Sequence, residues 1–283
     1  MKISIIISIK NRTKLFCRTL KLYNNQTLPK QHWELIVIDD NSEQNIINLL
    51  KEHASSLNYQ YIKINSHLND FPIFWGPSLS NNVGFKASNG EVIVITGPEI
   101  LHKETNLEFA YESAMQNKIA FGHVFHSHKT FVSLMDKNPL MEDYSFDRLF
   151  VLPSSKIMDI TKNTFYWFIC SVKKEYVMAV NGCDEEFMKG ICGDDDDFVN
   201  RIDKVGVKRV HDFRMIGIHQ DHSVEDMANP QRIRRNATWE EARIRNTKYL
   251  EDWGPVRKYQ TVVNQNRDWG SNKVILERHT NKI

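Results

Sequence analysis

SIIISIKNR, residues 4–12, and LIVIDDNS, residues 35–42, are the two stretches that decide the fold of this chain. Each contains a run of branched apolar residues, which favours a buried β-strand. Between them Leu15, Leu20 and Tyr23 fall on one face of a helix. Because two parallel strands need such a crossover, the segment predicts a βαβ unit with polar residues at its strand ends.

The same alternation of strand and helix patterns continues along the chain. We expect helices at 46–50, 80–88, 106–116, 173–180, 195–204 and 239–250, and strands at 59–64, 92–95, 119–125, 164–172 and 207–212. A polar loop is expected near 137–147. The pattern predicts an α/β fold of Rossmann-like type, with a mixed, mostly parallel sheet flanked by helices.

Composition limits the class of protein. The chain has 283 residues and 41% hydrophobic content, which is ordinary for a globular protein with a substantial core. No apolar run is long enough for a signal peptide or a membrane helix, so we expect a cytoplasmic protein. The cysteines show no CxxC pairing, which argues against a zinc cage or a disulfide framework. They are Cys17, Cys170, Cys183 and Cys192.

The small net charge of +2 is spread unevenly. From Asn229 to Ile283 twelve Lys and Arg stand against six acidic residues, a local +6 that leaves −4 for the rest. We therefore expect residues 223–283 to form a basic helical extension. It is either a solvated surface or a contact for an anionic partner such as nucleic acid, pyrophosphate or a membrane surface.

The segment NGCDEEFMKGICGDDDDF, residues 181–198, holds seven carboxylates, four of them consecutive. Consecutive aspartates repel one another, and a helix cap accounts for only one or two of them. The spacing does not match a calcium loop of EF-hand type. We therefore favour a working site over a purely structural helix start, since clustered titratable groups mark function.

Polar side chains also follow the expected strands, where open α/β sheets bind ligands. The chain has no glycine-rich phosphate loop of GxGxxG or GxxxxGK type, so the phosphates of a bound nucleotide must be neutralised in another way. A divalent cation held by carboxylate and imidazole would do so. Glu99, after the strand at 92–95, together with His219 or His222 supplies such ligands.

At these residues the chain resembles the inverting glycosyltransferases of family 2, which have a GT-A fold, and the resemblance runs from residue 3 to about residue 222. SIIISIKNR and VIDDNS resemble the nucleotide-binding unit that opens this family, and NNVGFKASNGEVIVITGPEIL resembles the segment that leads into its metal-binding DxD motif. The resemblance implies a nucleotide-binding half at 1–100 and an acceptor-binding half at 101–222. The nucleotide-binding residues that it implies are Ser8, Asn11, Arg12, Asp39, Asp40 and Asn82.

The DxD positions read Gly97, Pro98 and Glu99 in this chain, so only the last carboxylate remains. The resemblance therefore implies Glu99 as the sole acidic ligand of Mn²⁺ or Mg²⁺. The segment IHQDHS matches the family's closing metal histidine, with His219 as the first choice and His222 as the second.

The acidic segment resembles the part of the family that carries the catalytic base. This implies Asp195 as the general base and Asp194 as a ligand of the acceptor, and it leaves Asp196 or Asp197 for the helix start. Trp167, just upstream of this segment, is expected to contact the acceptor through its ring. Adjacent carboxylates raise the proton affinity of a base, which suits this role.

The expected activity is metal-dependent, inverting transfer of a sugar from a nucleoside diphosphate sugar, with UDP as the expected nucleotide, to an acceptor hydroxyl. The acceptor is a glycan, a lipid-linked glycan or, given the basic extension, a hydroxymethylated DNA base. The rival hypothesis is a non-catalytic, transferase-like binding module that has lost its metal.

Two further groups of residues have both a structural and a functional interpretation. His123, His126 and His128 lie close together, and we weigh a metal site against a polar strand edge. Trp75 and the aromatic run at 166–168 are more typical of a core, and a platform under a sugar ring or a base is the alternative.

Overall fold

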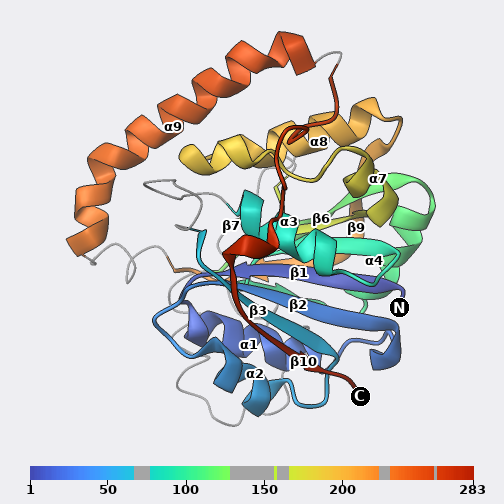
Figure 1. Ribbon diagram of the computed structural model, residues 1–283. Helices are drawn as coiled ribbons and strands as arrows, with labels where there is room; N and C mark the ends of the chain where they lie inside the picture. Colours follow the sequence, from blue (N-terminus) through green and yellow to red (C-terminus); the bar gives the residue numbers. More distant parts are fainter. Residues whose placement is uncertain (67–76, 128–155, 158–165, 223–229, 258–259) are drawn as a thin grey trace.

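The computed structural model describes residues 1–66, 77–127, 156–157, 166–222, 230–257 and 260–283 (Figure 1). Trp75, His128 and the expected polar loop at 137–147 lie outside the described residues. The helices are α1 (Thr13–Tyr23), α2 (Ile46–His53), α3 (Ser78–Ala87), α4 (Asn106–Met115), α7 (Lys174–Ala179), α8 (Asp194–Lys204) and α9 (Pro230–Arg257). The strands are β1 (Ile3–Ile9), β2 (Trp33–Asp40), β3 (Tyr59–Ile64), β4 (Val92–Thr96), β5 (Ile100–His102), β6 (Lys118–His126), β7 (Lys156–Ile157), β8 (Ile169–Lys173), β9 (Lys208–His219) and β10 (Ile275–Asn281).

The strands form a single mixed sheet in the order β10-β3-β2-β1-β4-β8-β6-β9-β5, with β7 paired to β6. Strands β3, β2, β1 and β4 are parallel, so their carboxyl ends meet at one edge. Strand β8 runs antiparallel to β4 and β6, and β9 is parallel to β6. The predicted α/β fold with a mixed sheet flanked by helices is therefore confirmed.

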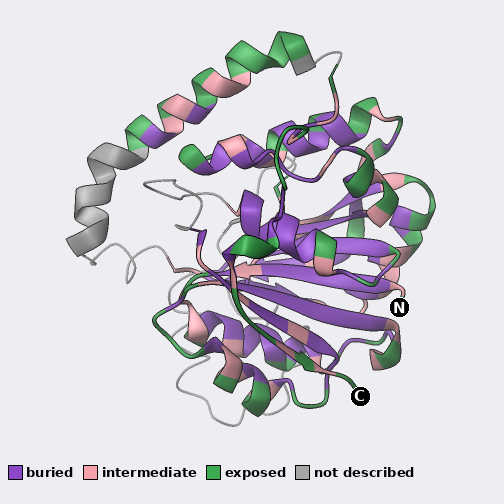
Figure 2. Cartoon of the chain, viewed as in Figure 1, coloured by how far each residue is buried: buried purple, intermediate pink, exposed green. Residues whose placement is uncertain are grey.

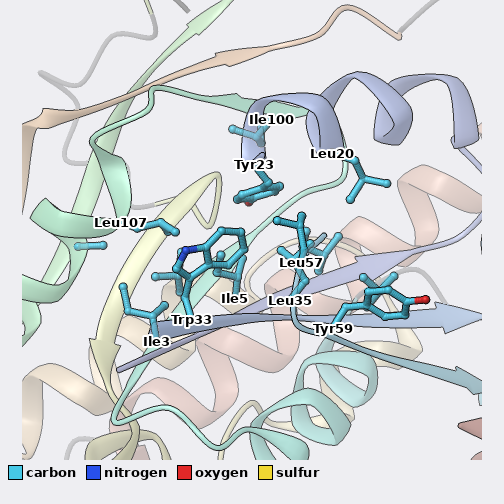
Figure 3. Packing of buried hydrophobic residues seen from close by; sticks show 14 of the residues in the cluster. Ile3, Ile5, Leu20, Tyr23, Trp33, Leu35, Leu57, Tyr59, Ile100 and Leu107 are labelled. Carbon is cyan, nitrogen blue, oxygen red and sulfur yellow. The ribbon is translucent and has the colours of Figure 1, made fainter. Parts of the chain in front are cut away.

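Alternation along the central strands divides the core into two layers. In β1, Ile3, Ile5 and Ile7 face the layer that holds α1, α2 and α4, and Ile6 faces the layer that holds α3, α7 and α8. Figure 1 shows α1 and α2 on one side of the sheet and α8 on the other, and Figure 2 shows the sheet buried between them. Figure 3 shows the first layer, where Trp33 and neighbouring aliphatic side chains pack beneath α1.

Helix α3 lies close against the sheet because it has a glycine at the point of contact. A methyl group added at Gly84 would lie 2.5 Å from Cγ2 of Ile6, well inside van der Waals contact. This approach brings the polar start of α3, with Asn81 and Asn82, beside the end of β1. The fold thus places amide side chains at the edge where the parallel strands end.

The end of the chain belongs to the main sheet, which corrects the expectation of a separate extension at 223–283. Strand β10 pairs antiparallel with β3, from Ile275↔Ile64 to Asn281↔Tyr59. In Figure 1 the chain leaves α9, passes α8 and returns to the sheet edge. Residues 275–281 therefore complete the sheet, although they lie beyond residue 222. No helix among the described residues is long and apolar enough to cross a membrane.

Candidate functional site

Glu99, His219 and His222 converge at the carboxyl edge of the sheet. Their ligand atoms all lie within 4.8 Å of one another, and no other group of three His, Cys, Asp or Glu side chains in the described part of the chain converges in this way. The pairing of Ile100 with His219 between β5 and β9 brings Glu99 to this point, and the Gln220 amide donates a hydrogen bond to the Glu99 carbonyl at 3.0 Å. Two segments distant in sequence thus share one site.

The Glu99 carboxylate is buried and lies between cationic and imidazole groups. Its Oε2 accepts a hydrogen bond from Arg12 at 2.9 Å, and its Oε1 lies 3.8 Å from Nε2 of His219. Burial by itself would raise the pKa of Glu99, but Arg12 and the two histidines outweigh it, so the pKa is lowered. The carboxylate is therefore held in its charged form.

Gly97 at the first DxD position is in contact with this carboxylate. A methyl group added there would lie 2.7 Å from Oε1 of Glu99, too close for a real contact. The glycine therefore leaves room for Glu99 to adopt its observed position, and an aspartate at residue 97 would require Glu99 to move.

His219 has the properties of a neutral imidazole ligand. Burial, partly offset by Glu99, lowers its pKa to about 4, and its Nδ1 is buried without a hydrogen-bond partner. Its ring lies 4.8 Å from that of His126 and 5.0 Å from that of Phe168, centroid to centroid. A buried carboxylate beside two partly buried imidazoles fits a divalent transition-metal ion such as Mn²⁺.

His126 is a neighbour of this cluster that the sequence analysis had considered in a different group. Strands β6 and β9 pair His126 with His219 and His123 with Ile216, and the His123 ring packs against Phe125 and Phe213. His123 and His126 thus have different neighbours, and the described part of the chain shows no cluster of metal ligands that includes either of them.

The residues expected to bind the nucleotide lie at the carboxyl ends of β1 and β2. Ser8 donates a hydrogen bond to Oδ1 of Asn81 at 2.7 Å. The Asn11 amide donates to Oγ of Ser42 at 2.7 Å, and Oδ1 of Asn11 accepts from the amide of Glu43 at 3.0 Å. Asn11 and the following arginine have positive φ values of 60° and 68°, which turns the chain toward β2.

The two aspartates at the end of β2 differ in environment. Asp39 is buried and accepts hydrogen bonds from the Ser42 amide at 2.8 Å and the Tyr61 hydroxyl at 2.8 Å. Asp40 is half-buried and accepts hydrogen bonds from the amide and the hydroxyl of Ser66. Asp40 is thus the more accessible of the two to a ligand.

Asn82, expected among the nucleotide-binding residues, is fully buried and faces the acidic segment. Its Nδ2 donates to the Cys183 carbonyl and to Oε1 of Glu185, both at 2.9 Å, and its Oδ1 accepts from the Cys183 amide at 2.8 Å. Its geometry is that of a structural link, which differs from our expectation because the helix turns it away from β1. Asn81, which the sequence analysis passed over, points toward Ser8 and has a buried Nδ2 without a partner.

The four consecutive aspartates occupy the first turn of α8, after Gly193 in the left-handed region at φ 84°. Asp197 forms a buried ion pair with Arg201 at 2.8 Å, so it holds the helix in place. Asp196 is exposed at the surface. Negative charge at a helix start is favourable in general, but only part of the run is needed for it.

Asp194 and Asp195, at the start of α8, both have a raised pKa. Burial is the main cause that raises the pKa of Asp194 to about 6, and burial with the charges of Asp194 and Asp196 raises that of Asp195 to about 8. One oxygen of Asp195 accepts a hydrogen bond from the Asp196 amide at 3.0 Å. A carboxyl whose proton affinity is raised in this way suits general-base chemistry.

An aromatic segment, Tyr166 to Phe168, connects the aspartates with the histidine cluster. The Trp167 ring packs edge-on against Phe198 of α8 at 5.5 Å, and its buried Nε1 has no hydrogen-bond partner. Phe168 packs against His219, as noted above. Burial, and then the charge of Asp195, raises the pKa of Tyr166.

A separate cleft of about 260 Å³ lies between α9 and the segment that follows it. It is lined mainly by residues 260 and 262–267, by Tyr249 and Trp253 of α9, and by Asp184 and Glu186. None of the residues expected to bind nucleotide or metal lines it. The Tyr249 hydroxyl donates to Asp184 at 2.8 Å, so α9 is bonded to the acidic segment here.

The family model of Glycosyl transferase family 2 matches residues 4–169, more than half of the chain, and the chain belongs to this family. Among curated relatives, it is 29% identical over 118 residues to the poly(ribitol-phosphate) β-N-acetylglucosaminyltransferase TarP of Staphylococcus aureus, covering 41% of this chain and 34% of that protein. It is 31% identical over 94 residues to the poly(ribitol-phosphate) β-glucosyltransferase of Bacillus spizizenii, covering 33% and 14%. The matched region thus spans about a third or less of these relatives.

Solved structures share the fold over most of the chain. A mannosyltransferase of Pyrobaculum calidifontis, in complex with GDP-Man and Mn²⁺, has a TM-score of 0.58 at 14% identity and covers 95% of this chain and 71% of that one. S. aureus TarS in complex with UDP-GlcNAc has a TM-score of 0.57 at 13% identity and covers 81% and 61%. At these identities the likeness shows the fold alone, and it confirms the predicted GT-A architecture.

Proposed function

We propose that this protein is a metal-dependent, inverting glycosyltransferase that moves a sugar from a UDP sugar to an acceptor hydroxyl. The observation that carries the proposal is the convergence of Glu99, His219 and His222, with ligand atoms within 4.8 Å, at the sheet edge where nucleotides bind in such folds. Family membership supports sugar transfer as the reaction. The structural neighbour solved with GDP-Man and Mn²⁺ supports the use of a divalent cation.

Each group has a distinct role in the proposed reaction. Glu99 and His219 hold the cation, with His222 as the third ligand. When bound, the cation supplies positive charge that stabilises the departing nucleoside diphosphate. Arg12, anchored on Glu99 at 2.9 Å, adds a fixed cation beside the diphosphate. Ser8 and Asp40 contribute polar contacts to the nucleoside at the ends of β1 and β2.

On the acceptor side, Asp195 takes the proton of the attacking hydroxyl. Its raised pKa matches a base that works near neutral pH. Asp194 accepts a hydrogen bond from another acceptor hydroxyl, and the ring of Trp167 borders the sugar ring. Proton transfer to a positioned base contributes about 10²- to 10⁴-fold in rate.

The acceptor is proposed to be a glycan or a polyol-phosphate polymer. This rests on the curated relatives, several of which are named for poly(ribitol-phosphate). A DNA acceptor receives less support, because some of the basic side chains that would contact DNA form ion pairs with acidic side chains of the same chain. Arg245 and Arg267 pair with Glu186, and Arg243 pairs with Glu240.

A thermal-shift panel tests donor and metal together. UDP-glucose, UDP-N-acetylglucosamine and GDP-mannose are each added with and without MnCl₂. A ligand at 100 times its Kd stabilises the folded state by about 2.7 kcal/mol, so a UDP sugar with manganese should raise Tm by several degrees. Glu99→Ala should remove the manganese-dependent part. If no nucleotide sugar shifts Tm under either condition, the proposal is wrong.

The rival function, a non-catalytic binding module, makes a different prediction in a hydrolysis assay. A transferase without acceptor slowly passes the sugar to water, so the enzyme should release UDP in the presence of manganese. Binding of a UDP sugar with no release of UDP, and with no effect of Glu99→Ala, would favour the binding module.

A further inference from the structure

We infer that Asn246 of α9 is a positioning residue for Asp195, which it holds through the turn that precedes α8. This inference rests on the proposed function, in which Asp195 is the general base. Asn246 does not touch the proposed reacting atoms. It lies in the helix that the sequence analysis treated as part of a basic extension. The family match ends at residue 169, before Asn246, and the relatives cover only parts of the chain, so neither comparison assigns Asn246 a role.

The side-chain amide of Asn246 binds two backbone carbonyls of the acidic segment. Its side chain is 1% exposed, and Nδ2 donates hydrogen bonds to the carbonyls of Phe187 at 2.8 Å and Cys192 at 3.0 Å. Its Oδ1 accepts from Arg245 at 2.7 Å, which fixes the amide's orientation. Both donors and the acceptor of one buried side chain are therefore used to join α9 to this segment.

The backbone supports the same contact. The Ile191 amide donates to the Ala242 carbonyl at 3.1 Å, one helical turn before Asn246. A methyl group at Gly190 would lie 2.4 Å from both the Ala242 carbonyl and Oδ1 of Asn246, so only glycine permits this approach. Figure 1 shows α9 on the far side of α8 from the sheet, where it can hold this turn from outside.

The turn that Asn246 holds is conformationally demanding. Cys192 has φ 66° and Gly193 has φ 84°, so two consecutive residues are left-handed just before α8 begins. A non-glycine residue in this region persists only when surrounding contacts fix it. The bond from Asn246 to the Cys192 carbonyl is such a contact, and the Gly193 carbonyl in turn accepts from the Asp197 amide at 3.0 Å to open the first helical turn.

The rest of α8 is anchored independently. Asp197 pairs with Arg201 inside the protein, and Phe198 and Ile202 lie in the core. Loss of the Asn246 contact should therefore loosen the first turn, with Asp194 and Asp195, and leave the helix in place. A general base that shifts by about 1 Å can lose about 10²-fold in rate.

Asn246→Ala tests this in the hydrolysis of UDP-N-acetylglucosamine and UDP-glucose with MnCl₂. We expect kcat to fall by about 10- to 100-fold while KM and the donor-induced rise in Tm stay close to wild type. The acid limb of the kcat profile should move to lower pH, because a loosened turn admits water to Asp195. Lys248→Ala, which replaces an exposed residue on the same helix, is the control and should change neither kcat nor the acid limb of its pH profile. An unchanged kcat and acid limb in a folded Asn246→Ala protein would overturn the inference.

A stability measurement keeps the test independent of activity. The groups that face Asp195 are Asp194, Asp196, Cys170, Cys192 and Tyr166. Asp195→Asn should raise Tm more at pH 8 than at pH 5, and this pH-dependent gain should shrink in the Asn246→Ala background. An equal gain in both backgrounds contradicts the inference even if no donor is ever turned over.

If Asn246→Ala does not fold, Arg245→Ala removes the bond that orients the amide and should give the same changes at smaller size. If the gain from Asp195→Asn shrinks in the Asn246→Ala background as expected but the wild-type protein binds no nucleotide sugar, the proposed function alone would be contradicted.

Discussion

At the scale of single residues, a few side chains decide whether this site works. Glu99 is the carboxylate of the proposed metal site, and its charge is maintained by Arg12 and the histidines around it. Gly97 is small because the Glu99 carboxylate lies against it. Asp195 is the opposite case, a carboxyl whose surroundings favour the protonated form. The surroundings of Glu99 thus favour its charged form and those of Asp195 its protonated form, and this difference in pKa separates the roles of the two acids.

Asp195→Asn should reduce turnover by at least about 100-fold and leave donor binding intact. The same change should stabilise the protein at pH 8. The folded-state pKa of about 8 lies above the ordinary 3.8, so the folded state binds the extra proton and loses stability as pH rises between these values. Removing the charge should therefore raise the free energy of unfolding at pH 8 by about 1–2 kcal/mol, after allowance for solvent screening. Urea unfolding at pH 5 and pH 8 measures it, and equal effects at both pH values would show that Asp195 is not perturbed.

Gly97→Ala should weaken manganese binding by about tenfold or more, because its methyl group displaces the Glu99 carboxylate. Calorimetric titration with MnCl₂ measures the affinity. Gly254→Ala is the matched control, since a methyl group at that position meets nothing within 4 Å. Unchanged manganese affinity in Gly97→Ala would mean that Glu99 is not a ligand in this position.

At the scale of elements, the βαβ start and the alternating helices were predictable because their apolar periodicity is strong. Strand β10 was missed because its side chains are mostly exposed and it joins the sheet through backbone pairing. The predicted strand ended at 212, whereas β9 continues to His219. The prediction stopped early because a register shift after Asp212 interrupts the strand's pattern. The adjacent amides at 81 and 82 show the limit for the site. The sequence analysis named Asn82, whereas in the structure it is Asn81 that contacts Ser8 and Asn82 that bonds to the acidic segment.

The same limit applies to α9. Its periodicity predicts a helix, but no sequence pattern reveals that Asn246 reaches the turn before α8. That contact depends on a close approach at Gly190.

Helix α8 depends on its one buried ion pair. Asp197→Asn would leave the Arg201 guanidinium, which is fully buried, without its countercharge. Removing one partner of a buried pair costs about 3–5 kcal/mol, so urea unfolding should show a loss of that order. Asp196→Asn, on the exposed side of the same turn, should change stability by less than about 0.5 kcal/mol. Similar values for the two variants would contradict the assignment of Asp197 to the helix.

At the scale of the whole molecule, the end of the chain stabilises its beginning. Strand β10 covers the edge of β3, and an uncovered edge is a site of aggregation. The segment before β10 ties into the acidic region, where the Gly270 amide donates to Oε1 of Glu185 at 2.6 Å. Residues beyond the matched family region therefore connect strand β3 with the acidic segment.

Removal of residues 275–283 should lower Tm by several degrees and produce soluble aggregates, because the β3 edge is exposed. Size-exclusion chromatography and a thermal melt measure both effects. Removal of Lys282 and Ile283 alone, beyond the strand, is the control. A monomeric truncated protein with an unchanged Tm would show that β10 contributes little.

The central claim is metal-dependent transfer of a sugar by this site, and the most direct measurement is the release of UDP from a UDP sugar, followed by mass spectrometry. The account predicts release by the wild-type protein that requires manganese, loss of release in Glu99→Ala and His219→Ala, and loss of release with retained donor binding in Asp195→Asn. Release that is independent of manganese and unaffected by Glu99→Ala would contradict it.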